Sequence, residues 1–252
     1  MEILITNDDG IDSKGLRVLS RLMQSLGHVT VVAPDGARSG QSGAISVMKP
    51  MRLKKISSHD NGDCDIYVSN GTPADCIKLA LNIIYQGKNP DLVVSGINHG
   101  SNASVNVVYS GTMGAVFVAA EHSIPAIGFS LCDHNTDADF SEFERYIVPL
   151  TQKLLSRPFP CGFCYNINAP KGKILGIRFT RQCRGYWEKE MKEYTDPSGE
   201  PFYWLVGNFV NCEPDNEETD EWALSHGYIA ITPTTIDMTA KEWNDSTSIG
   251  LE

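Results

Sequence analysis

The chain has 252 residues, enough for one large α/β domain with a buried core. Hydrophobic residues make up 41% of the chain and charged residues 21%, which argues against disordered and fibrous classes of protein. The net charge of −10 argues against a protein that binds nucleic-acid polymers through their backbone, because such binding depends on clustered Lys and Arg.

Neither the start of the chain nor its most apolar stretch has the pattern of a membrane segment. The first residues lack the basic and apolar regions of a signal peptide, and residues 114–131 are interrupted by Glu121, His122 and Pro125. The seven cysteines are odd in number and scattered, which is typical of reduced thiols. We therefore expect a cytoplasmic protein with no membrane partner.

Apolar runs of strand length alternate with helical patterns over the first two thirds of the chain. Strands are expected at residues 2–6, 29–33, 52–56, 65–69, 92–94 and 125–131. Helices are expected at residues 16–26, at 72–84, from about 112, and at about 140–150. The first helix is expected to stop at Gly27, a turn at Asp60–Asp63 predicts a hairpin, and residues 95–110 are expected to form a long loop.

The alternation of strand and helix up to about residue 168 predicts the fold class α/β, with a doubly wound, mostly parallel sheet and helices on both faces. Residues 174–236 differ in character, with strand-like runs at 177–180, 202–206 and 228–232 between polar segments rich in Gly and Pro. We expect a single domain of residues 1–252, with the α/β core and the active site in residues 1–170 and β extensions in residues 171–252.

Three polar loops each follow a predicted strand: Asn7–Gly10, Pro34–Gly43 and Ser95–Thr112. Ligands of an open α/β sheet bind beyond the carboxyl ends of the strands, so the three loops are expected to meet at one edge. The adjacent carboxylates of Asp8 and Asp9 would repel each other unless a cation lies near them, and such ligands suit Mg²⁺, Mn²⁺ or Ca²⁺ better than zinc. Taken alone, the same residues also fit an ordinary turn before a helix.

The second and third loops add groups that can bind a metal or an anion. Residues 38–43 offer hydroxyls and backbone N–H groups in a Gly-rich segment. Residues 95–102 bring neutral amide oxygens directly after a buried strand, and residues 109–112 lead into a helix whose positive N-terminal end suits an anion. A dinucleotide-binding dehydrogenase is not indicated, because no Gly-x-Gly-x-x-Gly follows the first strand.

Several motifs occur in an order that resembles the SurE family of survival-protein nucleotidases. They are Asn7-Asp8-Asp9-Gly10, Arg38-Ser39-Gly40, Gly71-Thr72-Pro73-Ala74-Asp75-Cys76, Ser95-Gly96-Ile97-Asn98 and Tyr109-Ser110-Gly111-Thr112. The resemblance continues through Asn166–Pro170, Tyr203-Trp204 and Gly227–Pro233, so it covers essentially the whole chain.

This resemblance implies a metal-dependent 5′-nucleotidase that acts on nucleoside monophosphates, with 3′-nucleotidase and exopolyphosphatase activities as further options. It implies one divalent metal ion per subunit, Mg²⁺ or Mn²⁺, and a Rossmann-like fold whose C-terminal β extensions join a homodimer or homotetramer. The implied metal ligands are Asp8, Asp9, Ser39 and Asn98, of which Asp8, Asp9 and Asn98 would also be catalytic. The implied phosphate-binding residues are Gly40, Ser42, Asn102, Ser110, Gly111 and Thr112.

The chain departs from the family pattern beside the expected anion site. Val105-Asn106 stands where many members carry two Asp residues, and Val118 stands where the following helix usually carries Glu. A nucleotide-binding regulator with little turnover is therefore an alternative to the hydrolase. A phosphatase with an aspartyl-phosphate intermediate is a more distant one, since it too places Asp after the first strand.

Two further sets of residues have alternative roles. His99, in the third loop, is a candidate general acid. A loop His beside an active site is more often solvated, or contacts the site residues and not the substrate. Arg181, Arg184, Tyr186 and Trp187 lie in the predicted extension, where they either reach over the nucleoside or pack within the extension or a subunit interface.

Overall fold

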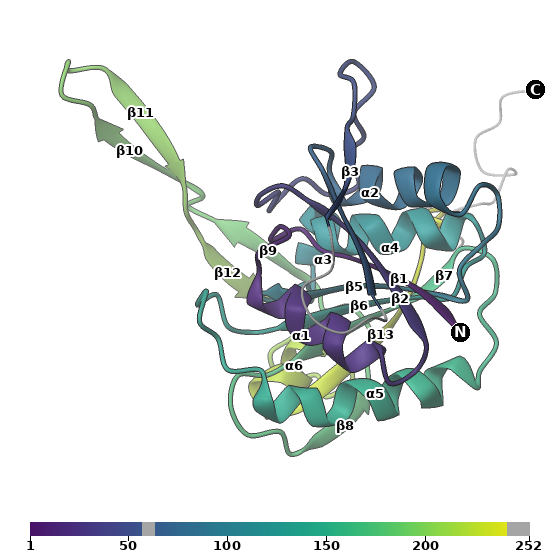
Figure 1. The fold of residues 1–252 in the computed structure, drawn as a ribbon. Helices are drawn as coiled ribbons and strands as arrows, with labels where there is room; N and C mark the ends of the chain where they lie inside the picture. The colour runs from purple at the N-terminus through teal and green to yellow at the C-terminus, as the bar shows by residue number, and fades with distance from the viewer. Residues whose placement is uncertain (57–63, 241–252) are drawn as a thin grey trace, which may run out of the picture.

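The computed structural model describes residues 1–56 and 64–240 of the chain, in which a nine-stranded sheet lies between helices on both of its faces (Figure 1). The strands of this sheet are β1 (Glu2–Thr6), β2 (His28–Pro34), β3 (Leu53–Ile56), β4 (Cys64–Ser69), β5 (Leu92–His99), β6 (Ala126–Leu131), β7 (Phe163–Ala169), β8 (Gly176–Phe179) and β13 (Tyr228–Thr235). The helices are α1 (Lys14–Met23), α2 (Pro73–Leu79) with its π-helical continuation η1 (Ala80–Ile84), α3 (Asn106–Tyr109), α4 (Gly111–Glu121), α5 (Ser141–Leu155) and α6 (Asp220–Ser225).

The order of the strands places a topological switch point between β1 and β5. The sheet runs β3-β4-β2-β1-β5-β6-β7-β13-β8, and β4, β2, β1, β5, β6 and β7 are parallel neighbours. Counted in chain order, these six strands follow the doubly wound arrangement 3-2-1-4-5-6. Within the nine described strands of this sheet, only the pairs β3–β4 and β7–β13 are antiparallel. The predicted α/β fold with a mostly parallel sheet is confirmed.

The hydrophobic core has two layers, one on each face of the sheet. Ile3 and Ile5 of β1 belong to the cluster that α1 and α5 cover, and Leu4 between them belongs to the cluster that α2 and α4 cover. Successive side chains of a strand point to opposite faces, so a strand covered on both sides must be apolar at every position. This requirement explains the continuous apolar run at the start of the chain.

The N-terminus of α2 is as the sequence predicts. Thr72 accepts a hydrogen bond from the Asp75 N–H, and the Asp75 carboxylate accepts one from the Thr72 N–H, which is a complete capping box with Pro73 in the first turn. Asp75 also accepts from the Ser46 N–H (3.0 Å), so the same carboxylate attaches the segment after β2 to this helix.

Residues 95–110 differ from the predicted long loop. β5 continues to His99 because it pairs with β6 on both sides of an irregularity between Ser95 and Asn98. The short helix α3 takes up four of the residues that follow. The first helix also ends earlier than predicted, at Met23 and not at Gly27. The Gly and Asn residues after Val94 indicate a turn by their composition, whereas pairing with β6 makes residues 95–99 part of a strand.

The last third of the chain forms part of the central sheet and also a projecting segment, residues 185–211, called the arm below. β8 and β13, which the sequence analysis assigns to β extensions, belong to the central sheet, where β13 pairs with β7 and β8 pairs with β13. The remaining strands form two small sheets, from β9 (Gly185–Glu188) with β12 (Asn208–Asn211) and from β10 (Met191–Thr195) with β11 (Pro201–Leu205). In Figure 1 the hairpin β10–β11 extends away from the body of the molecule.

Other expectations fall partly or wholly outside what the structure tests. The turn expected at Asp60–Asp63 lies outside the described residues, although the flanking strands β3 and β4 are antiparallel as predicted. The division of the chain at residue 170 stays a prediction. All seven cysteines lie in the described ranges and are free thiols. No described helix has both the length and the apolar character needed to cross a membrane.

Candidate active site

The turn after β1 places Asp8 and Asp9 at the carboxyl end of the strand. Asn7 is buried, and its amide nitrogen donates to the Gly10 carbonyl (3.0 Å) and to the hydroxyl of Ser13 (2.7 Å), the N-cap residue of α1. Gly10 has φ +96°, and a Cβ atom there would lie 2.9 Å from the backbone of the loop after β2, so only Gly fits. The two carboxylates therefore sit on a turn fixed at both ends.

Asp8 is a buried carboxylate for which residues 1–56 and 64–240 provide no cationic partner. Its side chain is close to fully buried, with 4% of the residue exposed, and its Oδ1 accepts a hydrogen bond from the Thr112 hydroxyl (2.6 Å). Burial raises the pKa of Asp8 to about 6, the Thr112 hydrogen bond lowers it, and the charge of Asp9 raises it further. No Lys or Arg of the described residues forms an ion pair with Asp8 or Asp9. An ionised Asp8 is thus destabilised unless a cation binds beside it.

Asp9 and His99 come together because β1 and β5 are neighbours in the sheet, and Asn98 directly precedes His99 in β5. Asp9 Oδ2 accepts from the main-chain N–H of His99 (3.3 Å) and lies 2.9 Å from its ring Nδ1. The amide nitrogen of Asn98 donates to the Gly100 carbonyl (2.8 Å), so its side-chain oxygen is the atom left to bind a cation. That the Asn98 amide oxygen shares a cation with the two carboxylates at the switch point stays a prediction.

The loop after β2 carries Ser39, Gly40 and Ser42 to the same edge of the sheet. The Arg38 N–H donates to the main-chain carbonyl of Asp8 (2.6 Å), which joins this loop to the turn after β1. Ser42 donates its N–H and its hydroxyl to two carbonyls of α3, at 3.0 and 2.7 Å. Ser39 and Gly40 are exposed. The predicted meeting of the three loops is thus present in the structure.

The N-terminus of α4 lies directly against Asp8. Ser110 is the N-cap residue, and its hydroxyl accepts from the Met113 N–H (3.0 Å). A Cβ atom at Gly111 would lie 2.8 Å from the Asp8 Cβ, so the helix could not approach this closely with a larger residue. The Thr112 hydroxyl contacts the Asp8 carboxylate. The positive end of α4 therefore lies beside Asp8, where it would favour an anion such as the expected phosphate.

Asn102 is held by the central sheet. It is buried, its main-chain N–H donates to Asn168 Oδ1 (2.7 Å), and its amide nitrogen donates to the Ser130 hydroxyl (2.8 Å). Its carbonyl accepts from the amide nitrogen of Asn166 (2.8 Å). These contacts fix the loop between β5 and α3. The phosphate-binding roles of Asn102, Gly40, Ser42, Ser110, Gly111 and Thr112 stay predictions.

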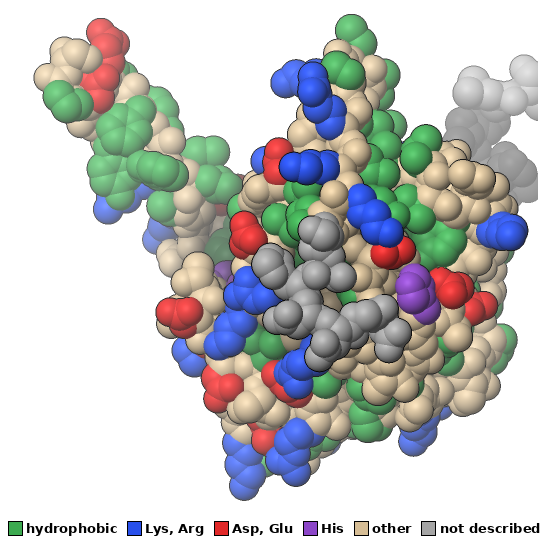
Figure 2. Space-filling view, in the orientation of Figure 1, with side chains coloured by type: hydrophobic (Ala, Val, Ile, Leu, Met, Phe, Trp, Pro, Cys, Tyr) green, Lys and Arg blue, Asp and Glu red, His purple; other side chains and the backbone are tan. Residues whose placement is uncertain are grey.

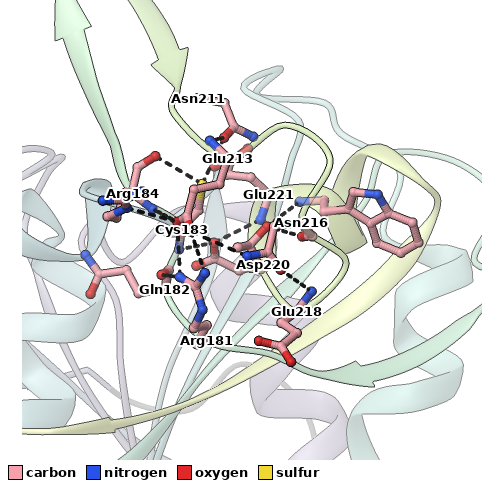
Figure 3. A network of polar contacts seen from close by, with 12 residues as sticks. Arg181, Gln182, Cys183, Arg184, Asn211, Glu213, Asn216, Glu218, Asp220 and Glu221 are labelled. Carbon is pink, nitrogen blue, oxygen red and sulfur yellow. Dashed lines mark hydrogen bonds and ion pairs between the residues drawn. The ribbon is translucent and has the colours of Figure 1, made fainter.

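A buried carboxylate that the sequence analysis missed attaches this loop to the segment just before the arm. Asp220, in the first turn of α6, accepts from the Ser104 N–H (2.8 Å) with one oxygen. Its other oxygen accepts from the Cys183 N–H (2.9 Å), as Figure 3 shows. Burial raises the pKa of Asp220, against the effect of these hydrogen bonds. The signal for the helix was present, since Thr219 followed by two acidic residues is an N-cap pattern. No pattern in the sequence indicated that Asp220 would contact Ser104 and Cys183, which lie far from it in the chain.

The sequence leaves two alternatives for Arg181, Arg184, Tyr186 and Trp187: that they reach over the nucleoside, or that they pack within the extension or a subunit interface. In the structure, Arg181 and Arg184 contact Glu213, and Trp187 contacts Asn106. Arg181 donates to Glu213 Oε2 (3.1 Å), and the Arg184 N–H donates to the same oxygen (2.8 Å), as Figure 3 shows. The Trp187 ring donates to Asn106 Oδ1 (2.9 Å) in α3. Asn106 is one of the two departures from the family pattern, and its side-chain oxygen is thus occupied by the arm.

The other departure, Val118, does not lie at the expected metal position. It is buried in the core layer that α2 and α4 form. Glu121, the nearest acid after it, lies about 15 Å along α4 from Gly111 at 1.5 Å per residue, and it pairs with Lys78 (3.8 Å). Glu121 therefore does not replace the missing carboxylate at the site.

The donor set fits a hard divalent cation. Within the described ranges, no group of three or more His, Cys, Asp or Glu side chains is placed to hold a metal ion. The predicted ligands Asp8, Asp9, Ser39 and Asn98 supply only two carboxylates, with a hydroxyl and an amide oxygen. Such oxygen donors suit Mg²⁺ or Mn²⁺ better than zinc.

Comparisons with known proteins show the family of the chain. The family model described as survival protein SurE matches residues 3–189. The 5′-nucleotidase SurE of Phocaeicola vulgatus is 46% identical over 250 residues, which is 96% of each chain. That of Flavobacterium psychrophilum is 47% identical over 241 residues, 94% of this chain and 93% of the relative. The crystal structure of the SurE protein from Aquifex aeolicus has a TM-score of 0.82 and 35% identity, over 96% of both chains. The chain therefore belongs to the survival protein SurE family.

Proposed function

We propose that this chain hydrolyses nucleoside 5′-monophosphates to nucleoside and phosphate in a reaction that requires one divalent metal ion. The pair Asp8 and Asp9 carries the proposal, because these adjacent carboxylates have no Lys or Arg partner among the described residues and one of them is buried. The relatives' name, 5′-nucleotidase SurE, supports a nucleoside monophosphate as the substrate.

Asp8, Asp9, Ser39 and Asn98 would hold Mg²⁺ or Mn²⁺ at the switch point. When bound, such an ion polarises a phosphoryl oxygen and lowers the pKa of bound water. The buried Thr112 hydroxyl orients Asp8, and the Asn98 side chain is oriented by its hydrogen bond to Gly100. In Asp8 and Asn98, this chain thus contributes two oxygen ligands that are oriented before the substrate arrives.

The phosphate would bind between the loop after β2 and the N-terminus of α4. Ser42 is already attached to α3 through its N–H and hydroxyl, so its loop is held beside the first turn of α4. The main-chain N–H groups of that turn favour negative charge, and this effect grows as charge develops on the phosphoryl oxygens. Asp8 or Asp9 would orient the attacking water.

Because of the departure from the family pattern at Val105-Asn106, a nucleotide-binding regulator with little turnover is the second candidate function. Hydrolysis of 3′-nucleotides and of short polyphosphates are further activities to test in the hydrolase. All of these ligands share a phosphoryl group, so one panel of substrates separates them.

The deciding experiment is phosphate release from nucleoside 5′- and 3′-monophosphates and from a short polyphosphate, with Mg²⁺, with Mn²⁺ and with chelator. We expect metal-dependent turnover that Asp8→Asn abolishes and that Asp12→Asn, an exposed carboxylate of the same turn, retains. Binding of nucleotide without turnover, in folded protein with either metal, would favour the regulator. Acid-stable phosphate attached to Asp8 would favour an aspartyl-phosphate mechanism.

We also propose that the hairpin β10–β11 joins subunits in a homodimer or homotetramer. Its side chains form a hydrophobic surface on the arm (Figure 2), in which Trp204 is 62% and Leu205 70% exposed. An exposed patch of this kind on a projecting hairpin is typical of a protein interface. Light scattering should give the mass of two or four chains, and a Trp204→Lys, Leu205→Lys variant should lower it, whereas Glu193→Gln on the same hairpin should not. A wild-type mass of one chain would contradict the proposal.

A further inference from the structure

His99 contacts a proposed metal ligand through both its backbone and its ring. Its main-chain N–H (3.3 Å) and its ring Nδ1 (2.9 Å) both approach Asp9 Oδ2. A carboxylate oxygen only accepts, so Nδ1 is the donor in this contact. No other hydrogen bond to the Asp9 carboxylate is present among the described residues, so Oδ1 is left for another partner.

The ring of His99 is locked in the interior. Its side chain is only 10% exposed, and it meets the buried ring of Phe140 edge-on, with centroids 5.2 Å apart. On another side, α1 approaches so closely that a Cβ atom at Gly15 would lie 3.4 Å from His99 Cε1. Nε2 is buried and has no hydrogen-bond partner among the described residues. A ring held in this way cannot swing out to protonate a leaving group without losing these contacts.

We propose that His99 is a positioning residue for Asp9, which it orients so that one carboxylate oxygen faces His99 and the other faces the metal. The proposal rests on the metal-dependent function proposed above. Hydrogen bonds to the outer side of a ligating carboxylate fix its orientation, and their loss typically weakens metal binding by about 10-fold to 100-fold. The role differs from that of a general acid, since His99 acts on the ligand and not on the substrate.

Two substitutions separate the hydrogen bond from the shape of the ring. His99→Phe keeps a ring that can pack against Phe140 and α1, and it removes the Nδ1–H donor. His99→Asn places an amide nitrogen at the position of Nδ1 along the side chain, so it can restore the donor to Asp9. His122→Phe, at an exposed position beyond the end of α4, is the matched control.

The test is the dissociation constant of Mn²⁺ for the folded, metal-stripped full-length protein, measured by titration calorimetry without substrate. We expect His99→Phe to weaken binding at least about tenfold, His99→Asn to recover most of the affinity, and His122→Phe to match the wild type. Thermal unfolding in chelator shows whether each variant is folded. At saturating Mn²⁺, the kcat for a nucleoside monophosphate should return to near the wild-type value in His99→Phe.

Three outcomes would overturn the proposal, and they differ from one another. Wild-type affinity together with a wild-type kcat in His99→Phe would show that the hydrogen bond does not matter to the metal, while the proposed function stands. Unchanged affinity with a kcat that saturating metal cannot restore would assign His99 to the reacting atoms. Absence of Mn²⁺ binding to the wild type would remove the proposed metal site itself.

Discussion

Replacing Asp8 with Asn is expected to stabilise the metal-free protein while it abolishes metal binding. Burial raises the pKa of Asp8 from its ordinary value of 3.8 to about 6. Each pKa unit corresponds to about 1.4 kcal/mol, so the ionised carboxylate lowers the free energy of unfolding by about 3 kcal/mol at neutral pH. Asn has the same shape without the charge, and its side-chain oxygen can still accept from Thr112. We therefore expect a gain of up to about 3 kcal/mol in chelator at pH 7.5.

The same shift gives the effect a pH dependence of known sign. Between about pH 4 and pH 6 the folded state still binds the proton of Asp8 and the unfolded state has lost it. Unfolding then releases a proton, so the wild type loses stability relative to Asp8→Asn as the pH rises through this range. Below about pH 4 the two proteins should be equally stable as far as this group is concerned.

Urea unfolding in chelator at pH 4 and at pH 7.5 measures both quantities. Asp12→Asn, which changes an exposed carboxylate in the same turn, should stay within about 0.5 kcal/mol of the wild type. Addition of Mn²⁺ at 100 times its dissociation constant should raise the stability of the wild type by about 2.7 kcal/mol and leave that of Asp8→Asn unchanged. If Asp8→Asn were no more stable than the wild type in chelator at pH 7.5, the reasoning from burial would be refuted.

Three further outcomes are expected. Gly111→Ala should weaken Mn²⁺ binding by tenfold or more, because its Cβ would lie 2.8 Å from that of Asp8, whereas Gly36→Ala, with nothing within 4 Å, should bind normally; equal affinities in calorimetry would contradict this. Trp187→Phe should lower the stability by about 1 kcal/mol in urea unfolding through loss of the hydrogen bond to Asn106, and an Asn106→Ala change in that background should add little; additive losses would argue against a shared contact. Mn²⁺ affinity should rise with pH through about 6, because the cation binds the ionised Asp8 carboxylate; a flat profile would show that Asp8 is already ionised.

Short-range patterns were enough to predict much of the fold. The alternation of apolar strands with amphipathic helices indicated a parallel sheet, and Thr72, Pro73 and Asp75 marked the start of α2 correctly. Both signals depend on residues that lie close together in the chain, so they can be interpreted without knowledge of the tertiary structure. The edge where the polar loops meet followed from the same alternation, because parallel strands bring their carboxyl ends together.

The sequence by itself thus determined the class of the fold, the position of Asp8 and Asp9 after the first strand, and the family resemblance of the motifs. The tertiary structure alone decided which distant groups these residues touch. Pairing with β6 drew Asn98 and His99 into a strand, and packing brought the His99 ring to Asp9 across 90 positions of the chain. Such contacts depend on how the elements pack in three dimensions, and that arrangement leaves no local trace in the order of the residues.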